Sequence, residues 1–272
     1  MKQATRTIAI LAVSALVGCA GQMQPVTPPD ATPMVLRVHS TTATAPLLAT
    51  FEEAYSQVQP RIVIDGQSAN HAALVTQLQA GQIDYFLSHH YPDDPTLWVA
   101  PLAQDALTLI TAPTNPTASI TTDQLRRLYR GYTRNWADVS GGTHTADVTL
   151  YSRENGSAIR TEFERLVMGQ ETISPNTQVL TTNSAILMRV ADQTGAIGYM
   201  PLSQLNQRVR VLAVDGVRPS RETILDLQYS LRMTIYVIGQ AEPQRDYRAF
   251  IGWMQGGAGQ AAIPASYAPL PR

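Results

Sequence analysis

The sequence predicts an α/β fold, in which helices cover a mainly parallel sheet. Short apolar runs rich in Val, Ile and Leu alternate with segments whose apolar residues recur every three or four positions, as on one face of a helix. Polar turns follow the first apolar runs, so that the order strand, turn, helix repeats along residues 34–90. This order is typical of parallel strands connected by helices.

The elements before residue 90 have clear boundaries. Pro60 ends the first helix, whose apolar stripe includes Leu47, Phe51 and Tyr55, and Gly81 ends the second helix. The predicted elements are strands at residues 34–38, 62–64 and 83–87, a helix with its stripe over 47–58 and a helix through 74–78.

The second half of the chain continues the alternation. Pro113 and the Asn115-Pro116 pair predict a boundary between two parts of the fold. Thr121 or Thr122 is expected to cap the next helix. The predicted elements are strands at 106–111, 148–151, 196–199, 209–214 and 230–238, helices at 123–129, 158–168, from Ser184 onward and around 247–254, and a loop that carries Trp136.

Composition excludes several classes of function. The 272 residues carry 20 Lys and Arg against 21 Asp and Glu, a formal net charge of -1, which argues against a general nucleic-acid binder. Lys2 is the only lysine and Cys19 the only cysteine. Beyond Cys19 the chain therefore has no phosphate-loop Lys, no Schiff-base Lys, no Cys nucleophile and no intrachain disulfide.

The N-terminal residues predict export and anchoring. Lys2 and Arg6 precede an apolar run at 8–17, which is too short to span a bilayer and is typical of a secretory signal peptide. Cys19 follows this run in a sequence that resembles the bacterial lipobox, in which the cysteine is lipidated. We therefore expect a lipoprotein signal peptide at 1–18 and a lipid anchor with a Pro-rich flexible spacer at 19–33. An ordinary signal peptide with a chance cysteine is the alternative.

Three strand-to-helix turns carry hydroxyl groups. A helix N-terminus offers free N–H groups and a partial positive charge, and the carboxyl ends of parallel strands meet at one edge of a sheet. The turns therefore predict a site for a small tetrahedral oxyanion, to which Arg153 adds a bidentate contact. Plain N-capping is the alternative for any single turn. The residues concerned are Ser40, Thr41 and Thr42 in the first turn, Ser68 in the second, and Gly156 and Ser157 in the third.

Several stretches resemble the periplasmic phosphate-binding (PstS-like) protein family, and together they cover most of the chain beyond the spacer. The resemblance rests on the order and the spacing of these stretches. The resemblance implies the type II periplasmic-binding-protein fold, with two α/β lobes, mostly parallel sheets, flanking helices and hinge strands. It also implies that the lobes close over an anion for delivery to an ABC permease. The stretches lie at residues 40–60, 78–90, 121–142, 152–167, 195–205 and 214–231.

The resemblance assigns ligand contacts residue by residue, with departures. Its first turn corresponds to Ser40, Thr41 and Thr42, and its second to Ser68. Its Arg loop corresponds to Arg153, Gly156 and Ser157, although Ala158-Ile159 replaces the usual Gly-Thr. Its Ser-Asp pair corresponds to Ser88 and His89.

His89 is the departure that changes the chemistry most. An Asp at this position accepts a hydrogen bond from the P–OH of a protonated phosphate and repels an anion without a proton. A histidine accepts a hydrogen bond when neutral and donates one when charged. The selection of phosphate over sulfate is therefore open.

Other chemistry is not expected. His39, His71, His89, His90 and His144 form no zinc motif, although His39 and His71 leave open a His-lined variant of the anion site. No nucleophile motif surrounds Ser157, so we expect no enzyme and no cofactor.

The sequence thus predicts a monomeric, extracytoplasmic protein that is tethered to the membrane only through Cys19. It would bind a small oxyanion, phosphate above all, for an ABC importer, with lobe 1 at 34–112 plus about 226–272 and lobe 2 at 113 to about 225. Alternatives are an exported sensor on the same fold and a binder of sulfate, molybdate or tungstate.

Overall fold

A computed structural model describes residues 33–142 and 144–271. The predictions for the signal peptide at 1–18, for Cys19 and for the rest of the spacer up to residue 32 lie outside the described residues. Within the described ranges, no helix combines the length and the apolar character needed to cross a bilayer.

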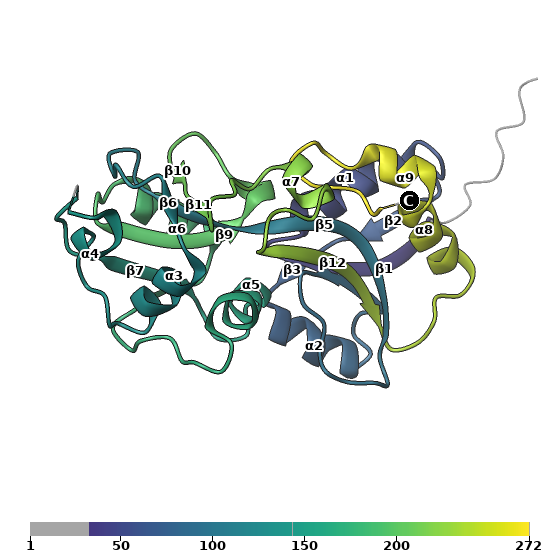
Figure 1. The fold of residues 1–272 in the computed structure, drawn as a ribbon. Coiled ribbons are helices and arrows are strands. Elements are labelled where there is room, and N and C mark those ends of the chain that lie inside the picture. The colour runs from purple at the N-terminus through teal and green to yellow at the C-terminus, as the bar shows by residue number, and fades with distance from the viewer. Residues whose placement is uncertain (1–32, 143, 272) are drawn as a thin grey trace, which may run out of the picture. The chain divides into compact units, whose positions relative to one another are not determined.

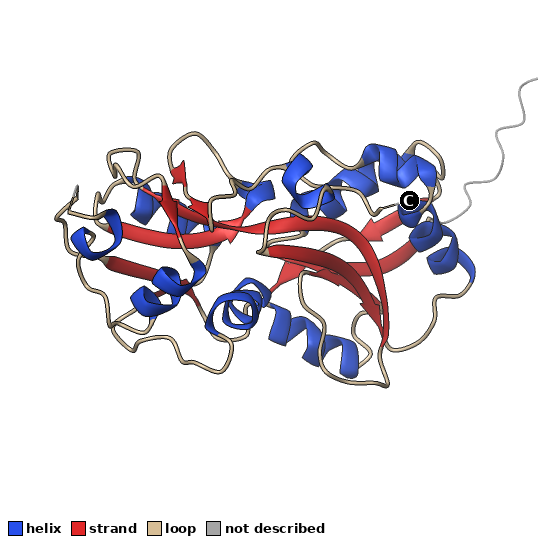
Figure 2. Cartoon of the chain, viewed as in Figure 1, coloured by secondary structure: helices blue, strands red, loops and turns tan. Residues whose placement is uncertain are grey.

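A single path of paired strands organises the fold, in the order β2-β1-β4-β12-β5-β9-β7-β8 (Figures 1 and 2). At its two ends the pairs are parallel, whereas β12 and β5 pair antiparallel with each other and with their outer neighbours β4 and β9. The strands on this path are β1 (Met34–Thr41), β2 (Ile62–Asp65), β4 (Tyr85–Ser88), β5 (Trp98–Thr111), β7 (Thr149–Arg153), β8 (Gln178–Leu180), β9 (Ala196–Pro201) and β12 (Arg232–Gly239).

The remaining strands are short. β3 pairs with β1, β10 pairs with β5, and β11 pairs with β6. Their bounds are Ser68–Ala69 for β3, Ser119–Ile120 for β6, Arg210–Val211 for β10 and Ala213–Val214 for β11.

Helices lie on both faces of the sheet. The α-helices are α1 (Ala45–Ser56), α2 (His71–Gln79), α3 (Thr122–Tyr129), α4 (Ala137–Ser140), α5 (Ala158–Phe163), α6 (Asn183–Ala191), α7 (Arg221–Leu225), α8 (Arg245–Gln255) and α9 (Gly257–Ala262). A π-helical turn, η1 (Glu164–Met168), continues α5, and a 3₁₀ turn, η2 (Leu202–Gln204), follows β9.

Around β1 and β4, different helices cover the two faces of the sheet. Phe51 of α1 and Phe250 of α8 pack with Leu36 and Leu87 in one cluster. On the opposite face, Leu74 and Leu78 of α2 pack with Phe86 and Ile238. Because Phe86 and Leu87 are adjacent in one strand, their side chains point to opposite faces, and both are fully buried.

The same alternation organises the strands around β7 and β9. Ile197 and Tyr199 of β9 join the cluster formed by α3 and α5, whereas Ala196 and Met200 join α6 on the other face. Apolar side chains on both faces are typical of a sheet covered on both sides.

The structure matches the predicted α/β class and corrects several details. The centre of the sheet is antiparallel, because β5 and β12 cross it in opposite directions. The single strand predicted at 209–214 is two strands, because β10 pairs with β5 and β11 with β6. The helix predicted at 158–168 changes to π-helical hydrogen bonding after Phe163. Trp136 lies directly before the short helix α4, fully buried, and its Nε1 donates to Gly195 O at 2.9 Å.

We expect Phe163→Ala to lower the free energy of unfolding by about 3–5 kcal/mol, because it leaves a cavity beneath α5. Phe163 is fully buried and stacks on Tyr199 with a centroid distance of 4.1 Å. Urea unfolding followed by circular dichroism measures the change. Val179→Ala in β8, where the side chain is exposed, is the control and should stay within about 0.5 kcal/mol. Equal effects of the two substitutions would contradict this account of the core.

Candidate functional site

Three turns meet at a small cavity of about 10 Å³. The first turn connects β1 to α1, the second connects β3 to α2, and the third connects β7 to α5. The cavity is lined by Thr41, Thr42 and Ala43 from the first, Ala69, Asn70 and His71 from the second, and Arg153, Ser157, Ala158 and Ile159 from the third.

The first turn has a fixed hydroxyl arrangement. Thr41 Oγ1 lies 2.9 Å from Thr44 Oγ1, and Thr44 Oγ1 donates to Leu87 O at 2.8 Å. The Ser40 hydroxyl is buried without a hydrogen-bond partner among the described residues. Thr41 and Thr42 therefore reach the cavity as predicted, whereas Ser40 lies beside it.

The second turn presents residues other than the predicted one. Ser68 pairs with Ser40 in the short β3–β1 contact; it is exposed and does not line the cavity. The next residues line it instead. Asn70 caps α2, since its Oδ1 accepts from Ala72 N at 2.9 Å, and its Nδ2 donates to Glu154 at 2.8 Å. A polar residue directly before a helix signals such a cap, and the sequence interpretation did not use it.

His71 lines the cavity as an uncharged side chain near neutral pH. Burial, and to a smaller extent the charge of His90, lower its pKa to about 4, while Glu162 acts in the opposite direction. Its Nδ1 lies 2.9 Å from Ser88 Oγ, and its ring lies 5.6 Å from that of His90. Ser88 is thus engaged with His71 and does not line the cavity itself.

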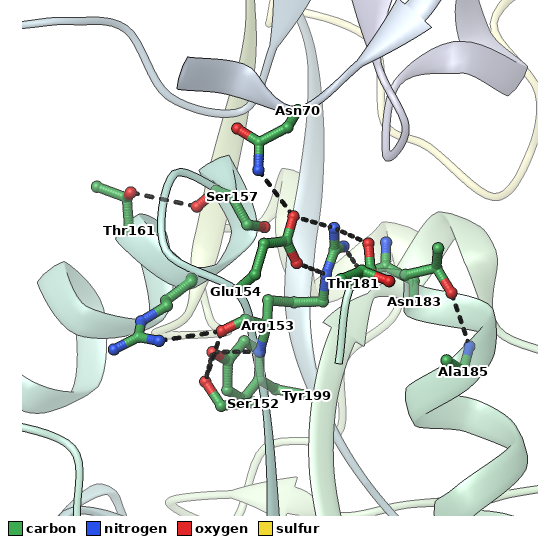
Figure 3. A network of polar contacts seen from close by, with 12 residues as sticks. Asn70, Ser152, Arg153, Glu154, Ser157, Thr161, Thr181, Asn183, Ala185 and Tyr199 are labelled. Atoms are coloured by element: carbon green, nitrogen blue, oxygen red, sulfur yellow. Dashed lines mark hydrogen bonds and ion pairs between the residues drawn. The ribbon is translucent and has the colours of Figure 1, made fainter. Parts of the chain in front are cut away.

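Arg153 is buried, with 2% of its surface exposed, and its guanidinium is held on several sides (Figure 3). Nε and Nη2 donate to the two carboxylate oxygens of Glu154 at 3.0 and 3.1 Å. Nη2 also donates to Thr181 O at 3.0 Å, and Nη1 donates to Asn183 Oδ1. The bidentate contact predicted for a ligand is therefore made by the neighbouring carboxylate in this structure.

The third turn approaches the second closely. Gly156 has a φ of 82°, and a Cβ atom there would lie 2.9 Å from both Ala72 Cβ and Asn70 Oδ1. The absence of a side chain allows Gly156 O to accept from Ala72 N at 3.1 Å. Ser157 precedes α5 without capping it through its side chain, and it lines the cavity.

His89 lies away from this cavity, in the wall of a second pocket of about 350 Å³. Its side chain is fully buried against Asp105, with 3.1 Å between Nε2 and Oδ2. Beside it, His90 Nδ1 lies 2.9 Å from Glu162 Oε1. Burial raises the pKa of Glu162, but hydrogen bonds from His90 and Arg165 outweigh this and hold that pKa below its usual value.

Gln204 is a further contact that the sequence interpretation missed. Its Nε2 donates to the carbonyls of Thr42 and Ala43 at 3.1 and 3.0 Å, and its Oε1 accepts from Asn183 at 2.6 Å. Asn183 in turn contacts Arg153, so that Gln204 connects the third turn to the first. No local motif marks Gln204, because its role depends on residues more than 150 positions away.

A metal centre finds no support in the part of the chain that the structure describes, where no group of three or more His, Cys, Asp or Glu side chains is placed to hold an ion.

Comparisons with known proteins identify a family and similar proteins. A family model described as a PBP superfamily domain matches residues 25–256. The phosphate-binding protein PstS of Bacillus subtilis is 24% identical over 204 residues, which cover 72% of this chain and 67% of that protein. The phosphate-binding protein PstS 2 of Streptococcus pneumoniae TIGR4 is 26% identical over 137 residues, so the chain spans about half of that relative (47%).

Two solved structures have similar folds. A phosphate ABC transporter substrate-binding protein from Clostridium perfringens, with bound phosphate, gives a TM-score of 0.80 at 22% identity, covering 87% of this chain and 100% of that one. An ABC-type phosphate transport receptor from Vibrio cholerae gives 0.74 at 21% identity, with the same coverage. These relatives confirm the resemblance to phosphate-binding proteins, and the structures confirm the fold.

The low pKa of His71 has a consequence for stability. Between pH 6.5 and about 4, the unfolded chain protonates this residue and the folded chain does not, so the unfolded state binds more protons. Acidification through this window should therefore lower the free energy of unfolding by up to about 3 kcal/mol. We expect His71→Gln to remove this part of the pH dependence in urea unfolding measured from pH 7 to pH 4. Gln79→Ala, at an exposed position of α2, should retain it; an unchanged slope in His71→Gln would contradict the assignment.

Proposed function

Because the chain belongs to the PBP superfamily, we propose that it is a solute-binding protein that captures a small oxyanion, phosphate above all, for an ABC importer. The observation that carries this proposal is the convergence of three turns on one cavity. Thr42, Ser157 and Arg153 line the cavity beside the N-termini of α1 and α2. Thr41 also lines it, but its hydroxyl donates to Thr44 Oγ1, because Thr44 donates to Leu87 O. The other groups are donors that a tetrahedral oxyanion requires.

The relatives support phosphate as the ligand. The proteins of Bacillus subtilis and Streptococcus pneumoniae are named phosphate-binding proteins, and the Clostridium perfringens structure contains phosphate. The resemblance places His89 where the family has an acidic residue, but His89 lines a different pocket from the anion cavity. Sulfate, molybdate and tungstate therefore belong in any test of this chain.

Closure of two lobes would bring the donors together. We place lobe 1 at residues 34–112 with about 226–272 and lobe 2 at 113 to about 225, so that the turns at Thr41 and Asn70 belong to one lobe and Arg153 to the other. A cavity of about 10 Å³ holds roughly one water molecule, which is less than an oxyanion needs. Binding therefore requires that the two sides separate and close again by hinge motion.

Arg153 would share its donors between Glu154 and the ligand. A guanidinium has five N–H groups, and those of Arg153 that face Glu154, Thr181 and Asn183 leave one on Nη1. The bound oxyanion would accept a hydrogen bond from this N–H group, or it would replace the Glu154 carboxylate as the acceptor for Nε and Nη2. In both arrangements Glu154 orients the guanidinium before the ligand arrives.

Placement outside the cytoplasm completes the proposal. The lipobox-like sequence ending at Cys19 would tether a monomer to the membrane by lipid alone, and the spacer would let it reach the permease. The chain would bind no nucleic acid, because it carries 21 acidic against 20 basic residues.

We expect the protein to bind phosphate in calorimetric titration and Arg153→Ala to weaken that binding by roughly 1.5–3 kcal/mol, as expected for a charged hydrogen bond. This corresponds to a roughly tenfold to hundredfold higher Kd. The matched control is Arg189→Ala, which removes an exposed guanidinium on α6 and should leave the Kd unchanged.

The same titration with sulfate, molybdate and tungstate identifies the preferred anion. Binding of none of the four would refute the proposed function, and an unchanged Kd in Arg153→Ala would remove Arg153 from the site.

A further inference from the structure

Gln204 makes a set of hydrogen bonds that joins the first turn to the residues around Arg153. Its Nε2 donates to Thr42 O at 3.1 Å and to Ala43 O at 3.0 Å, and both of these residues line the anion cavity. Its Oε1 accepts from Asn183 Nδ2 at 2.6 Å. Gln204 does not line the cavity, so its contacts act on the cavity wall and not on the space inside.

The direction of each of these hydrogen bonds follows from the two ends of the set. At one end, the carbonyls of Thr42 and Ala43 only accept, so the NH₂ group of Gln204 must face them. At the other end, the Arg153 guanidinium only donates, so Oδ1 of Asn183 must face Nη1 (Figure 3). The NH₂ group of Asn183 then faces Oε1 of Gln204. The two side chains therefore form an amide relay, which runs from the guanidinium to the first turn.

The amide relay has a fixed position in the fold. Asn183, with 5% of its surface exposed, is the first residue of α6. Ser203, directly before Gln204, is held on β5, because its N–H and its hydroxyl donate to the two carboxylate oxygens of Asp105 at 3.2 and 2.6 Å. Asp105 is fully buried. Gln204 therefore reaches the first turn from a position that the turn itself does not set.

Hydrogen bonds to both carbonyls fix the direction of two peptide groups in the cavity wall. The C=O and the N–H of a trans peptide group point in opposite directions. The Thr42 carbonyl, which faces Gln204, therefore directs the N–H of Ala43 the other way. The Ala43 carbonyl likewise directs the N–H of Thr44, which donates to Thr41 O at 2.9 Å. Gln204 thus stabilises the conformation in which the first turn enters α1.

We propose that Gln204 is a positioning residue of the anion site, which together with Asn183 holds the first turn against the Arg153 side of the cavity and so retains a bound oxyanion. The inference rests on the proposed function and deepens it by naming the contact that keeps the site closed. With lobe 2 at 113 to about 225, Gln204 would cross from lobe 2 to the first turn of lobe 1. Its two hydrogen bonds to that turn would then form on closure and break on opening.

Gln204→Glu tests this role with almost no change in side-chain size. A carboxylate has no proton to donate, so one of its oxygens would face the Thr42 and Ala43 carbonyls and repel them. The other oxygen would still accept from Asn183. Protonation of the new carboxyl in acid supplies one donor toward the carbonyls, so binding should partly recover there, which a general structural defect would not do. Gln204→Ala removes the amide without adding a charge.

We expect Gln204→Glu to raise the Kd for inorganic phosphate at least about tenfold over the wild-type value in calorimetric titration at pH 8, because two hydrogen bonds are replaced by repulsion. At pH 5, closer to the ordinary glutamate pKa of about 4.3, the ratio of variant to wild-type Kd should be at least about twofold smaller. This ratio removes the effect of pH on phosphate itself. Gln204→Ala should also raise the Kd, with a ratio that is the same at both pH values.

Gln193→Glu is the matched control. Gln193 is exposed, and its Nε2 donates to the Thr149 hydroxyl at 2.7 Å. A hydroxyl can also donate to the new carboxylate, so this substitution should leave the Kd for phosphate unchanged.

Hydrogen exchange of the protein without phosphate measures the hold on the first turn directly. The backbone amides of residues 42–48 should exchange faster in Gln204→Glu than in the wild-type protein near neutral pH. Those of residues 106–111 in β5 should keep their rate, which shows that the variant is folded.

The outcomes separate the two hypotheses. If the wild-type protein binds phosphate and Gln204→Glu keeps the same Kd, the inference is wrong and the proposed function stands. A Kd ratio for Gln204→Glu that is equal at pH 5 and pH 8, or unchanged exchange of residues 42–48, also overturns the inference. If the wild-type protein binds none of the four oxyanions, the proposed function fails and the retention role of Gln204 fails with it. If it prefers another of the four, that anion replaces phosphate in the same comparison.

Discussion

The buried guanidinium of Arg153 is the constraint on which the arrangement of the site depends. A charge with 2% exposure must be paired and hydrogen-bonded, and its partners come from Glu154, Thr181 and Asn183. Those partners are held in turn: Asn70 donates to Glu154, and Asn183 contacts Gln204. The partners of this one cation therefore connect the second turn, the third turn and the start of α6 (Figure 3). Gln204 connects the same network to the first turn.

Charges in and next to this cavity are balanced locally, so the proposed anion capture would not rely on a long-range positive field. His71 is neutral because burial disfavours its charged form. Glu154 pairs with Arg153, and in the neighbouring second pocket Glu162 contacts both His90 and Arg165. A lysine-free chain beyond residue 2 with nearly equal numbers of acidic and basic residues extends the same balance to the whole molecule. Selectivity must then come from hydroxyls, backbone N–H groups and the protonation of single side chains.

Local signals in the sequence predict the fold class, most helices and strands, and two of the three turns that line the cavity. They do not predict residues that reach their place only through pairing between distant strands. The hydroxyl of Ser68 suggests a ligand contact, but Ser68 pairs with β1 and is exposed, and Asn70 and His71 line the cavity instead. Asp105 lies inside a 14-residue strand with no motif around it, and only the pairing of β5 with β12 brings it to His89. Glu154 follows Arg153 in the sequence. Residue spacing does not show that the Glu154 carboxylate accepts hydrogen bonds from the Arg153 guanidinium, because this depends on side-chain geometry.

The contacts that close the cavity are few and polar, which bears on how a ligand enters. Gln204 holds the first turn, and Asn70 and the N–H of Ala72 hold Glu154 and Gly156 of the third. Hydrogen bonds of this kind contribute about 1 kcal/mol each in net terms, so separating the two sides costs a few kcal/mol if the apolar clusters stay intact. Charge-assisted hydrogen bonds to an oxyanion offset a cost of that size. The proposed hinge motion would therefore break only these few polar contacts, and they would form again when the two sides close.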